Sequence, residues 1–152
     1  MTQVVLPQFA NALGTVFGGQ IMAWLDICAA VSAQRHARGS VVTASIDSIN
    51  FIAPVKQGQV VVLHSQVNAV FKSSMEIGVT VRAEDPFTGE QHEACRAYCT
   101  FVALDMNGHP VEVLPIKLET PEEEQRSKEA HERRRLRLEA RSATRSMNKA
   151  AL

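Results

Sequence analysis

Apolar positions in the first quarter of the chain follow a helical pattern. Residues 21–31 are apolar on nearly every face of a helix, and Asp26 is the charged residue among them. Because a helix that is apolar all round is buried, we expect a buried helix from residue 19 or 20 to residue 36. Arg35 and His36 suit its negative C-terminal end, and Gly39 suits its C-cap.

The middle of the chain follows the two-residue period of β-strands. In residues 75–84 apolar side chains alternate with polar ones. Apolar side chains on one face predict strands over residues 59–71 and 93–104, β-branched residues predict a strand over residues 41–51, and a short apolar segment predicts a brief strand within residues 1–9. Turn signals separate these segments at Gln57-Gly58, Asp85–Gly89 and Asn107-Gly108.

One buried helix and a run of antiparallel strands predict an α+β domain over residues 1–119, with the sheet wrapped over the helix. Residues 120–152 carry many charges and few apolar side chains. Thr120-Pro121-Glu122-Glu123 is a capping box with proline at the first helical position. We expect an exposed, charged C-terminal helix that frays, with about the last ten residues disordered.

Length and charge exclude several classes of protein. The 152 residues have a formal net charge of zero, and this length suits a single domain. The basic run Arg133-Arg134-Arg135 is interleaved with Glu129, Glu132 and Glu139, which is typical of a solvated helix face. We therefore expect no nucleic-acid partner and no membrane. Attachment to either through the basic run is the alternative.

Cysteine usage and the N-terminus predict a cellular location. The three cysteines, Cys28, Cys95 and Cys99, are odd in number and contain no C-x-x-C spacing, which favours reduced, buried thiols over disulfides or a zinc site. The first residues do not resemble a signal peptide, and the apolar stretch 21–31 is far shorter than the roughly 20 residues of a membrane span. We expect a cytoplasmic protein.

Asp26 is the first candidate for chemistry. It lies mid-helix between Leu25 and Ile27 in an otherwise apolar segment. A carboxylate there is costly unless it is paired, hydrogen-bonded or open to a cavity, and such surroundings suit a general base. The alternative is a structural aspartate that pairs with an arginine of a neighbouring element or subunit.

The glycine-rich loop before the helix is the second candidate. Gly18 and Gly19 stand where this loop enters the helix, and helix N-termini bind anions and stabilise developing oxyanions. Asn11 begins the same loop and could orient a water molecule or donate to a carbonyl. The alternatives are a tight turn for the glycines and an Asx turn for Asn11.

The spacing between these candidates predicts a site shared by two subunits. Seven residues separate Gly19 from Asp26, which is roughly 10 Å along one helix. A base and an oxyanion donor must both lie within a few ångströms of one reacting carbon. If both act, Asp26 comes from a second subunit that faces the loop of the first.

Other site types have little support. No G-x-S-x-G, P-loop, G-x-G-x-x-G or H-E-x-x-H motif occurs, and the histidines do not cluster as metal ligands. Lys72-Ser73-Ser74, between two predicted strands, is a candidate for binding phosphate groups, with a solvated turn as its alternative. Thr43 is a candidate for lining the site, although a strand threonine is usually structural.

Several segments together resemble the acyl-CoA thioesterase branch of the hot-dog superfamily. The likeness covers about residues 4–126, and its specificity lies in the order and spacing of the segments. They are Asn11-x-x-Gly14-x-Val16-Phe17-Gly18-Gly19, Met22-x-x-Leu25-Asp26-x-x-Ala29, Arg35-His36-Ala37, Val42-Thr43-Ala44-Ser45-Ile46-Asp47-x-Ile49-Asn50-Phe51, Pro54-Val55-x-x-Gly58, Lys72-Ser73-Ser74-Met75-Glu76 and Thr100-Phe101-Val102-Ala103-Leu104.

The resemblance implies hydrolysis of acyl-CoA thioesters, with coenzyme A as part of the substrate and no cofactor. It implies a curved sheet around a central helix, two such units paired into a dimer with one continuous sheet, and often a trimer of dimers. The family's catalytic asparagine and aspartate map to Asn11 and Asp26, from opposite subunits. Relatives often have a polar pair before the asparagine, where this chain has Phe9-Ala10, which leaves substrate preference in doubt.

The resulting hypothesis assigns a role to each candidate. The N–H of Gly19, with that of Gly18, holds the thioester oxygen, and Asp26 of the partner activates water or attacks directly. Asn11 positions the water or the carbonyl. Two alternatives stay open: an acyl-thioester hydratase or dehydratase, which would use a histidine paired with an acid, and a non-catalytic acyl-CoA-binding module.

Overall fold

The computed structural model describes the backbone of residues 1–150 and the side chains of residues 1–144. The chain divides into two compact units, Met1–Pro115 and Ile116–Leu152. The first contains the sheet and a long helix, and the second contains one helix. Disorder is expected for about the last ten residues. Because the side chains of residues 145–152 lie outside the described part, this expectation stays a prediction.

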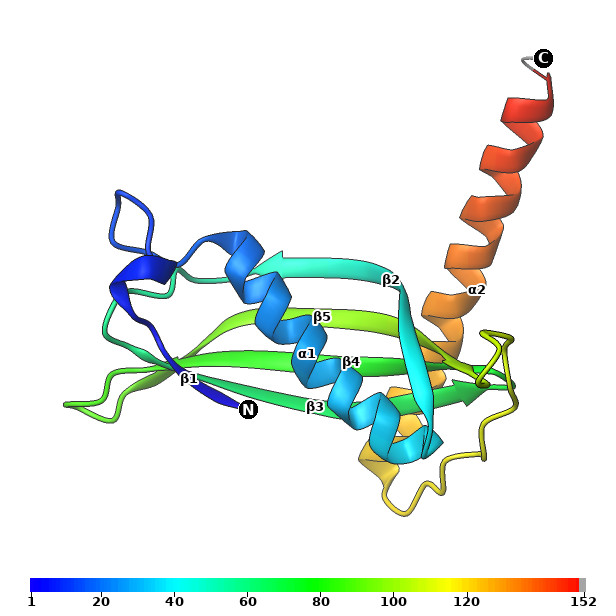
Figure 1. Ribbon diagram of the computed structural model, residues 1–152, viewed down its shortest axis with the longest axis horizontal. Helices are drawn as coiled ribbons and strands as arrows, with labels where there is room; N and C mark the ends of the chain where they lie inside the picture. The colour runs from blue at the N-terminus through cyan, green and yellow to red at the C-terminus, as the bar shows by residue number, and fades with distance from the viewer. Residues whose placement is uncertain (151–152) are drawn as a thin grey trace. The chain divides into compact units, whose positions relative to one another are not determined.

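Five antiparallel strands form the sheet of the first unit (Figure 1). They are β1 (Thr2–Val4), β2 (Ser40–Phe51), β3 (Val60–Phe71), β4 (Ser74–Glu84) and β5 (Gln91–Leu104). Their order across the sheet is β1-β3-β4-β5-β2, so β2 forms one edge. The predicted strands are all present, and β3, β4 and β5 contribute buried apolar side chains to the core.

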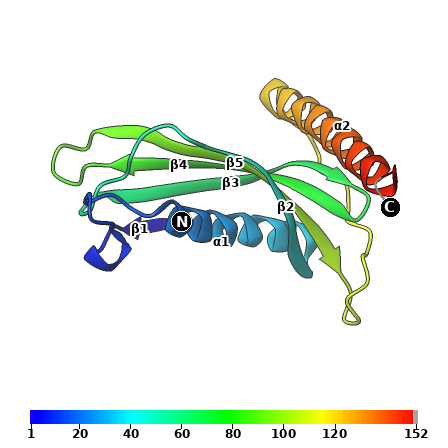
Figure 2. The same ribbon diagram turned by 90° about the horizontal axis from the view of Figure 1, so that it is seen from above.

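Helix α1 (Gly18–Ala37) lies along one face of the curved sheet (Figure 2). Its buried side chains recur at helical spacing, and they are Ile21, Trp24, Leu25, Cys28, Ala29 and Ala33. They share one hydrophobic core with buried strand residues such as Leu63, Ile77 and Phe101. The predicted α+β fold, a sheet wrapped around one long helix, is confirmed.

Burial of α1 is one-sided within the single chain, whereas its sequence predicts burial on every face. Met22, Ile27 and Val31 are 40%, 54% and 41% exposed. The sheet covers one face of the helix only, so apolar side chains on the opposite face have no cover from this chain. Such an apolar stripe is typical of a surface that contacts another molecule.

The segment between β1 and α1 is anchored at several points. It begins with the short 3-10 helix η1 (Pro7–Phe9), and the Phe9 ring packs edge-on against Trp24, with centroids 5.2 Å apart. The Val16 N–H donates to the Val55 carbonyl at 2.8 Å, and the Asn11 N–H donates to the Thr15 carbonyl at 2.8 Å. These contacts fix the loop from which α1 begins.

The second unit consists mainly of α2 (Pro121–Ala150), whose described side chains are mostly exposed. The predicted capping box is confirmed, since the Glu123 N–H donates to Thr120 Oγ1 and the Thr120 N–H donates to Glu123 Oε2, each at 3.2 Å. The ion pair between Arg135 and Glu132, at 2.6 Å, suits a solvated helix. Among the described residues, neither α2 nor α1 is long and apolar enough to cross a membrane.

Candidate active site

The N-terminus of α1 presents two unused backbone donors. Phe17 is the N-cap, and its side chain caps no N–H group. The first N–H groups of a helix have no intrahelical partner, and within the described residues no hydrogen bond involves the N–H of Gly18 or Gly19. Both glycines are exposed, and a Cβ at Gly19 would meet nothing within 4 Å. A developing oxyanion could therefore approach these donors.

The Asn11 side chain is held by its own loop. Its Oδ1 accepts hydrogen bonds from the N–H of Leu13 at 2.9 Å and of Thr15 at 3.2 Å. Its Nδ2 donates to Thr15 Oγ1 at 3.0 Å. This is the Asx-type arrangement that the sequence left open as an alternative. Because a side-chain amide has two N–H groups, one of them stays available for a carbonyl or a water molecule.

Asp26 and Thr43 lie in contact. The Thr43 hydroxyl donates to Asp26 Oδ1 at 2.7 Å, so two residues singled out from the sequence meet here. Asp26 is half-buried at the margin of the exposed face of α1. Among the described residues Asp26 forms no ion pair, so an arginine partner for it is not found in this part of the chain. Thr43 leaves Oδ2 of the carboxylate open to other partners.

The sheet beneath Asp26 carries a buried thiol. Burial, together with the charges of Asp26 and Asp47, raises the pKa of Cys99 to about 12. Burial, with the Glu93 charge, likewise raises the pKa of Cys95 to about 11. Both thiols are therefore protonated near neutral pH, and a protonated thiol is a poor nucleophile. The Asp26 carboxylate, rather than a cysteine, is therefore the candidate for the reactive group at this place.

The N-terminus of α1 and Asp26 lie beside different parts of the sheet, which are far apart along β5. A Cβ at Gly18 would lie 3.4 Å from Phe51 Cζ, and Phe51 pairs with Cys95 of β5. Thr43, the partner of Asp26, pairs with Phe101. Cys95 and Phe101 are about 20 Å apart along an extended strand, and α1 runs unbroken between its two candidates. One chain therefore does not bring Gly19 and Asp26 together.

The Lys72-Ser73-Ser74 turn joins β3 to β4. Lys72 is exposed and has a positive φ of 54°, and its carbonyl accepts a hydrogen bond from the Val113 N–H at 2.7 Å. Ser74 pairs with Val102 of β5, one position beyond the partner of Thr43. The turn therefore lies at the Asp26 end of the sheet and not at the Gly18–Gly19 end.

A cavity of about 370 Å³ opens beside the helix N-terminus. It is mostly apolar, and its wall comes from the loop before α1, the first turn of α1, the segment after β2 and the first part of β5. Its lining residues are Thr15, Val16, Gly18, Ile21, Phe51, Ile52, Ala53, Pro54, Val55, Ala94 and Cys95. The sequence patterns do not indicate this cavity, because its walls come from separate segments of the chain.

Comparison with known proteins places the chain in a family. A family model described as the thioesterase superfamily matches residues 13–89. An uncharacterized acyl-CoA thioester hydrolase of Bacillus subtilis is 46% identical over 122 residues, which cover 80% of this chain and 71% of that protein. The chain belongs to the acyl-CoA thioesterases of the hot-dog fold.

Solved structures of this thioesterase family have the same fold. An acyl-CoA hydrolase of Staphylococcus aureus, solved with butyryl coenzyme A, coenzyme A and coenzyme A disulfide, is 35% identical with a TM-score of 0.89 and covers 100% of this chain and 93% of its own. An apo-hexameric acyl-CoA thioesterase is 36% identical with a TM-score of 0.89, over 92% and 90% of the two chains.

Other thioesterases of the family are much longer than this chain. The acetyl-coenzyme A thioesterase of Rattus norvegicus is 38% identical over 139 residues, which cover 91% of this chain and 25% of the rat protein. The chain thus spans about a quarter of that relative.

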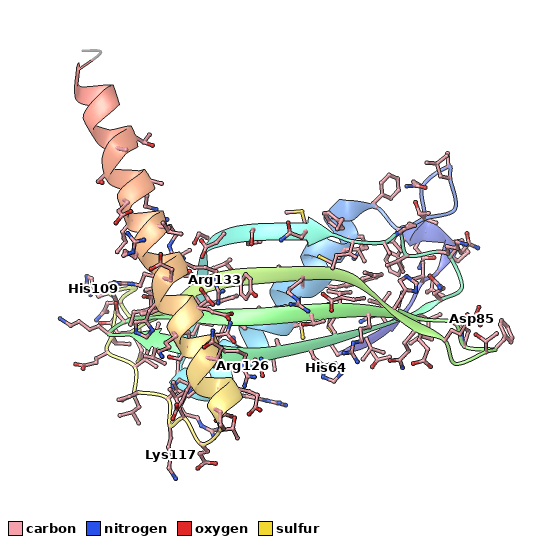
Figure 3. All side chains as sticks on the ribbon, turned by 180° about the vertical axis from the view of Figure 1, so that it is seen from behind. His64, Asp85, His109, Lys117, Arg126 and Arg133 are labelled. Atoms are coloured by element: carbon pink, nitrogen blue, oxygen red, sulfur yellow. The ribbon has the colours of Figure 1, made fainter. Side chains whose placement is uncertain are left out.

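Within residues 1–144, histidines and metal ligands do not gather at the candidate site. A His–carboxylate pair, His109 Nδ1 and Asp105 Oδ2 at 3.6 Å, lies in the turn after β5, at the end of the sheet opposite the Asp85 hairpin (Figure 3). His36 Nε2 contacts the Leu114 carbonyl at 2.8 Å, near the C-terminal end of α1. Within residues 1–144 no group of three or more His, Cys, Asp or Glu could hold a metal ion. This arrangement favours the thioesterase over the hydratase alternative.

Proposed function

We propose that this chain hydrolyses acyl-CoA thioesters to a free acid and coenzyme A. The observation that carries the proposal is the Asp26 carboxylate, which is held by Thr43 at 2.7 Å on the exposed face of an apolar helix. A carboxylate fixed by one oxygen, with the other accessible, suits proton transfer. A non-catalytic acyl-CoA-binding module would have no use for such a costly group.

The reaction follows from the positions of these groups. The thioester oxygen accepts hydrogen bonds from the N–H groups of Gly19 and Gly18, which stabilise the oxyanion that forms on attack. Asp26 accepts a proton from water as the water oxygen bonds to the carbonyl carbon, or attacks that carbon directly. The C–S bond then breaks, and the coenzyme A thiolate leaves and takes up a proton. After direct attack the acyl group stays on Asp26 as a mixed anhydride, which water hydrolyses to release the free acid and restore the carboxylate. The free amide N–H of Asn11 positions the water or the carbonyl.

Two subunits contribute to each site in this proposal. Within one chain Gly19 and Asp26 are separated by roughly 10 Å of helix, which is too far for both to act on one carbon. In a symmetric dimer, Gly19 of one subunit faces Asp26 of the other, and the symmetry produces two equivalent sites. The dimer thus brings a Gly19 and an Asp26 to the same site, which a single chain does not do.

The surface of the single chain supports such a dimer. Strand β2 is a twelve-residue edge strand, and a long unpaired edge tends to pair with another strand. Ile27 and Val31, which are exposed and lie four residues apart, form an apolar stripe on the helix beside it. Pairing of two β2 edges would produce one continuous sheet and cover both stripes. The hexameric relatives support further assembly of such dimers into a trimer of dimers.

Variants of the Staphylococcus aureus enzyme support the choice of residues. Solved structures of that enzyme include three variants in which an asparagine, an aspartate and a threonine are each replaced by alanine. In that chain the aspartate lies 15 positions after the asparagine, and the threonine lies 17 positions after the aspartate. Asn11, Asp26 and Thr43 have the same spacing in this chain.

The coenzyme A phosphates are assigned to the Lys72-Ser73-Ser74 turn. Lys72 is exposed, and its ammonium with adjacent hydroxyls suits a phosphate group. The turn lies at the Asp26 end of its own chain. A coenzyme A whose thioester sits between one subunit's Gly19 and its partner's Asp26 would therefore extend towards the partner's turn.

Replacing the threonine that holds the carboxylate should slow the reaction. Thr43→Val keeps the side-chain shape and removes the hydroxyl that donates to Asp26. Because a hydrogen bond to a charged group contributes about 1.5–3 kcal/mol, we expect kcat to fall about tenfold or more. The measurement is steady-state release of free thiol from acyl-CoA. The control is Thr80→Val on β4, whose kcat should stay at the wild-type value. An unchanged kcat in Thr43→Val would show that the Thr43 hydroxyl does not contribute to catalysis.

The direct test of the proposed function is thiol release from acyl-CoAs of graded chain length by the wild-type protein. We expect turnover of at least one chain length, with equal amounts of free acid and coenzyme A formed. The absence of release at every length, in protein that still binds coenzyme A, would indicate the binding module instead.

A further inference from the structure

We infer that the cavity beside the N-terminus of α1 binds the acyl chain and restricts the enzyme to short and medium acyl groups. This inference rests on the proposed thioesterase function and adds the class of substrate. Gly18 lines the cavity and also carries one of the two unused donors. An acyl chain attached to a carbonyl held at Gly18 and Gly19 therefore lies at the mouth of the cavity.

The cavity wall is suited to hydrocarbon. Val16, Ile21 and Val55 are buried and line it. Two backbone carbonyls in the wall are already paired: the Val55 carbonyl accepts from Val16 N–H at 2.8 Å and the Ala94 carbonyl accepts from Ile52 N–H at 2.9 Å. A wall of buried apolar side chains, with the unused Gly18 N–H at its mouth, favours an apolar chain attached to a carbonyl.

A β-bulge delivers Ala94 to this wall. Val81 of β4 pairs with Cys95, while the next residue, Arg82, pairs with Glu93, so Ala94 has no opposite residue in the ladder. Bulges re-aim side chains and are frequent beside active sites. Ala94 is only 1% exposed and lines the cavity, so its small methyl leaves space that a larger side chain would fill.

The size of the cavity sets the class of acyl group. At about 370 Å³ it lies near the lower end of the roughly 300–1,000 Å³ typical of small-molecule sites. Ile21 and Ala94 line the cavity and are buried, so a long acyl chain would have to displace core side chains. We therefore expect a hexanoyl chain to fit without such displacement, and a palmitoyl chain, which has ten more carbons, to require it.

The test compares kcat/KM for acetyl-, hexanoyl- and palmitoyl-CoA. Since each buried methylene adds about fourfold, hexanoyl-CoA should exceed acetyl-CoA by at least about tenfold, and palmitoyl-CoA should be poorer than hexanoyl-CoA. Ala94→Leu fills the cavity and should lower the hexanoyl-to-acetyl ratio at least about tenfold. Circular dichroism and the oligomeric mass of Ala94→Leu, measured beside those of wild type, show whether the variant folds.

Two further variants separate the cavity from the rest of the core. Ile21→Ala enlarges the cavity and should raise palmitoyl-CoA activity relative to hexanoyl-CoA. Ile77→Ala makes the same truncation at a fully buried strand residue outside the cavity and should keep the wild-type ratios. An unchanged ratio in both Ala94→Leu and Ile21→Ala, or a wild-type preference for palmitoyl-CoA, would overturn the inference.

A binding measurement distinguishes failure of the inference from failure of the proposed function. S-hexyl-CoA is a thioether that cannot be hydrolysed, and calorimetry compares it with coenzyme A. We expect tighter binding of S-hexyl-CoA by at least about tenfold, and loss of this preference in Ala94→Leu. If no acyl-CoA is hydrolysed but the preference is found, the proposed hydrolysis fails and the cavity assignment stands. If wild type shows no preference, the cavity assignment fails.

Discussion

Asp26→Asn should lower kcat for acyl-CoA hydrolysis by about 100-fold or more, the size expected for a lost general base. The asparagine has nearly the same shape and can still accept the hydrogen bond that Thr43 donates to Asp26. The variant should therefore fold and assemble like the wild type and lose only the charge and the basicity. The measurement is free-thiol release with the acyl-CoA that the wild type hydrolyses fastest.

The matched control is Asp85→Asn, which makes the same change in the β4–β5 hairpin. Asp85 accepts hydrogen bonds from the N–H groups of Phe87 and Thr88, and neither residue belongs to the site. Its kcat should stay within a few-fold of wild type. Wild-type kcat in Asp26→Asn, with unchanged thermal unfolding, would show that Asp26 has a structural role only.

Val31→Glu should abolish both assembly and activity. Val31 is 41% exposed in the single chain, and the proposed dimer covers it with the partner subunit. Burying an unpaired carboxylate costs several kcal/mol, so the variant should become a folded monomer with at least about 100-fold less activity, since a monomer lacks the partner's Asp26. Light scattering measures the mass and thiol release measures the activity.

Val31→Ala is the control for this prediction. It removes apolar surface without introducing a charge, so it should remain an oligomer and keep measurable activity. Val31 lies more than one helical turn beyond Asp26, which separates the effect on assembly from a direct effect on the carboxylate. A Val31→Glu protein that keeps the mass and the activity of wild type would show that this face of α1 is not the subunit interface.

The fold follows from the sequence because local patterns and burial agree. The alternation in residues 75–84 corresponds to β4, with Met75, Ile77 and Val79 in the core. The apolar run 21–31 correctly predicts α1, but the sequence cannot distinguish burial against the sheet from burial against a second subunit. Ile27 and Val31 are exposed in the single chain, although the sequence of the helix predicts burial on all sides.

Part of the candidate site could be predicted from the sequence. Asp26 is conspicuous because a charge in an apolar helix requires an explanation, and the structure adds its contact with Thr43. The cavity could not be predicted from the sequence, because Ile21, Phe51 and Ala94 come from three separate segments. The bulge that re-aims Ala94 also depends on the register between β4 and β5, which no local pattern in β5 specifies.

The most direct test of the shared site is complementation between two inactive variants. Asn11→Ala and Asp26→Asn are each expected to be inactive as pure proteins. In a mixed dimer, one site combines the intact Asn11 of one subunit with the intact Asp26 of the other. Equal co-expression with random pairing should therefore restore about a quarter of wild-type activity, since half of the dimers are mixed and each has one intact site of two. No recovery in mixed dimers, isolated through two different affinity tags, would contradict a site built from opposite subunits.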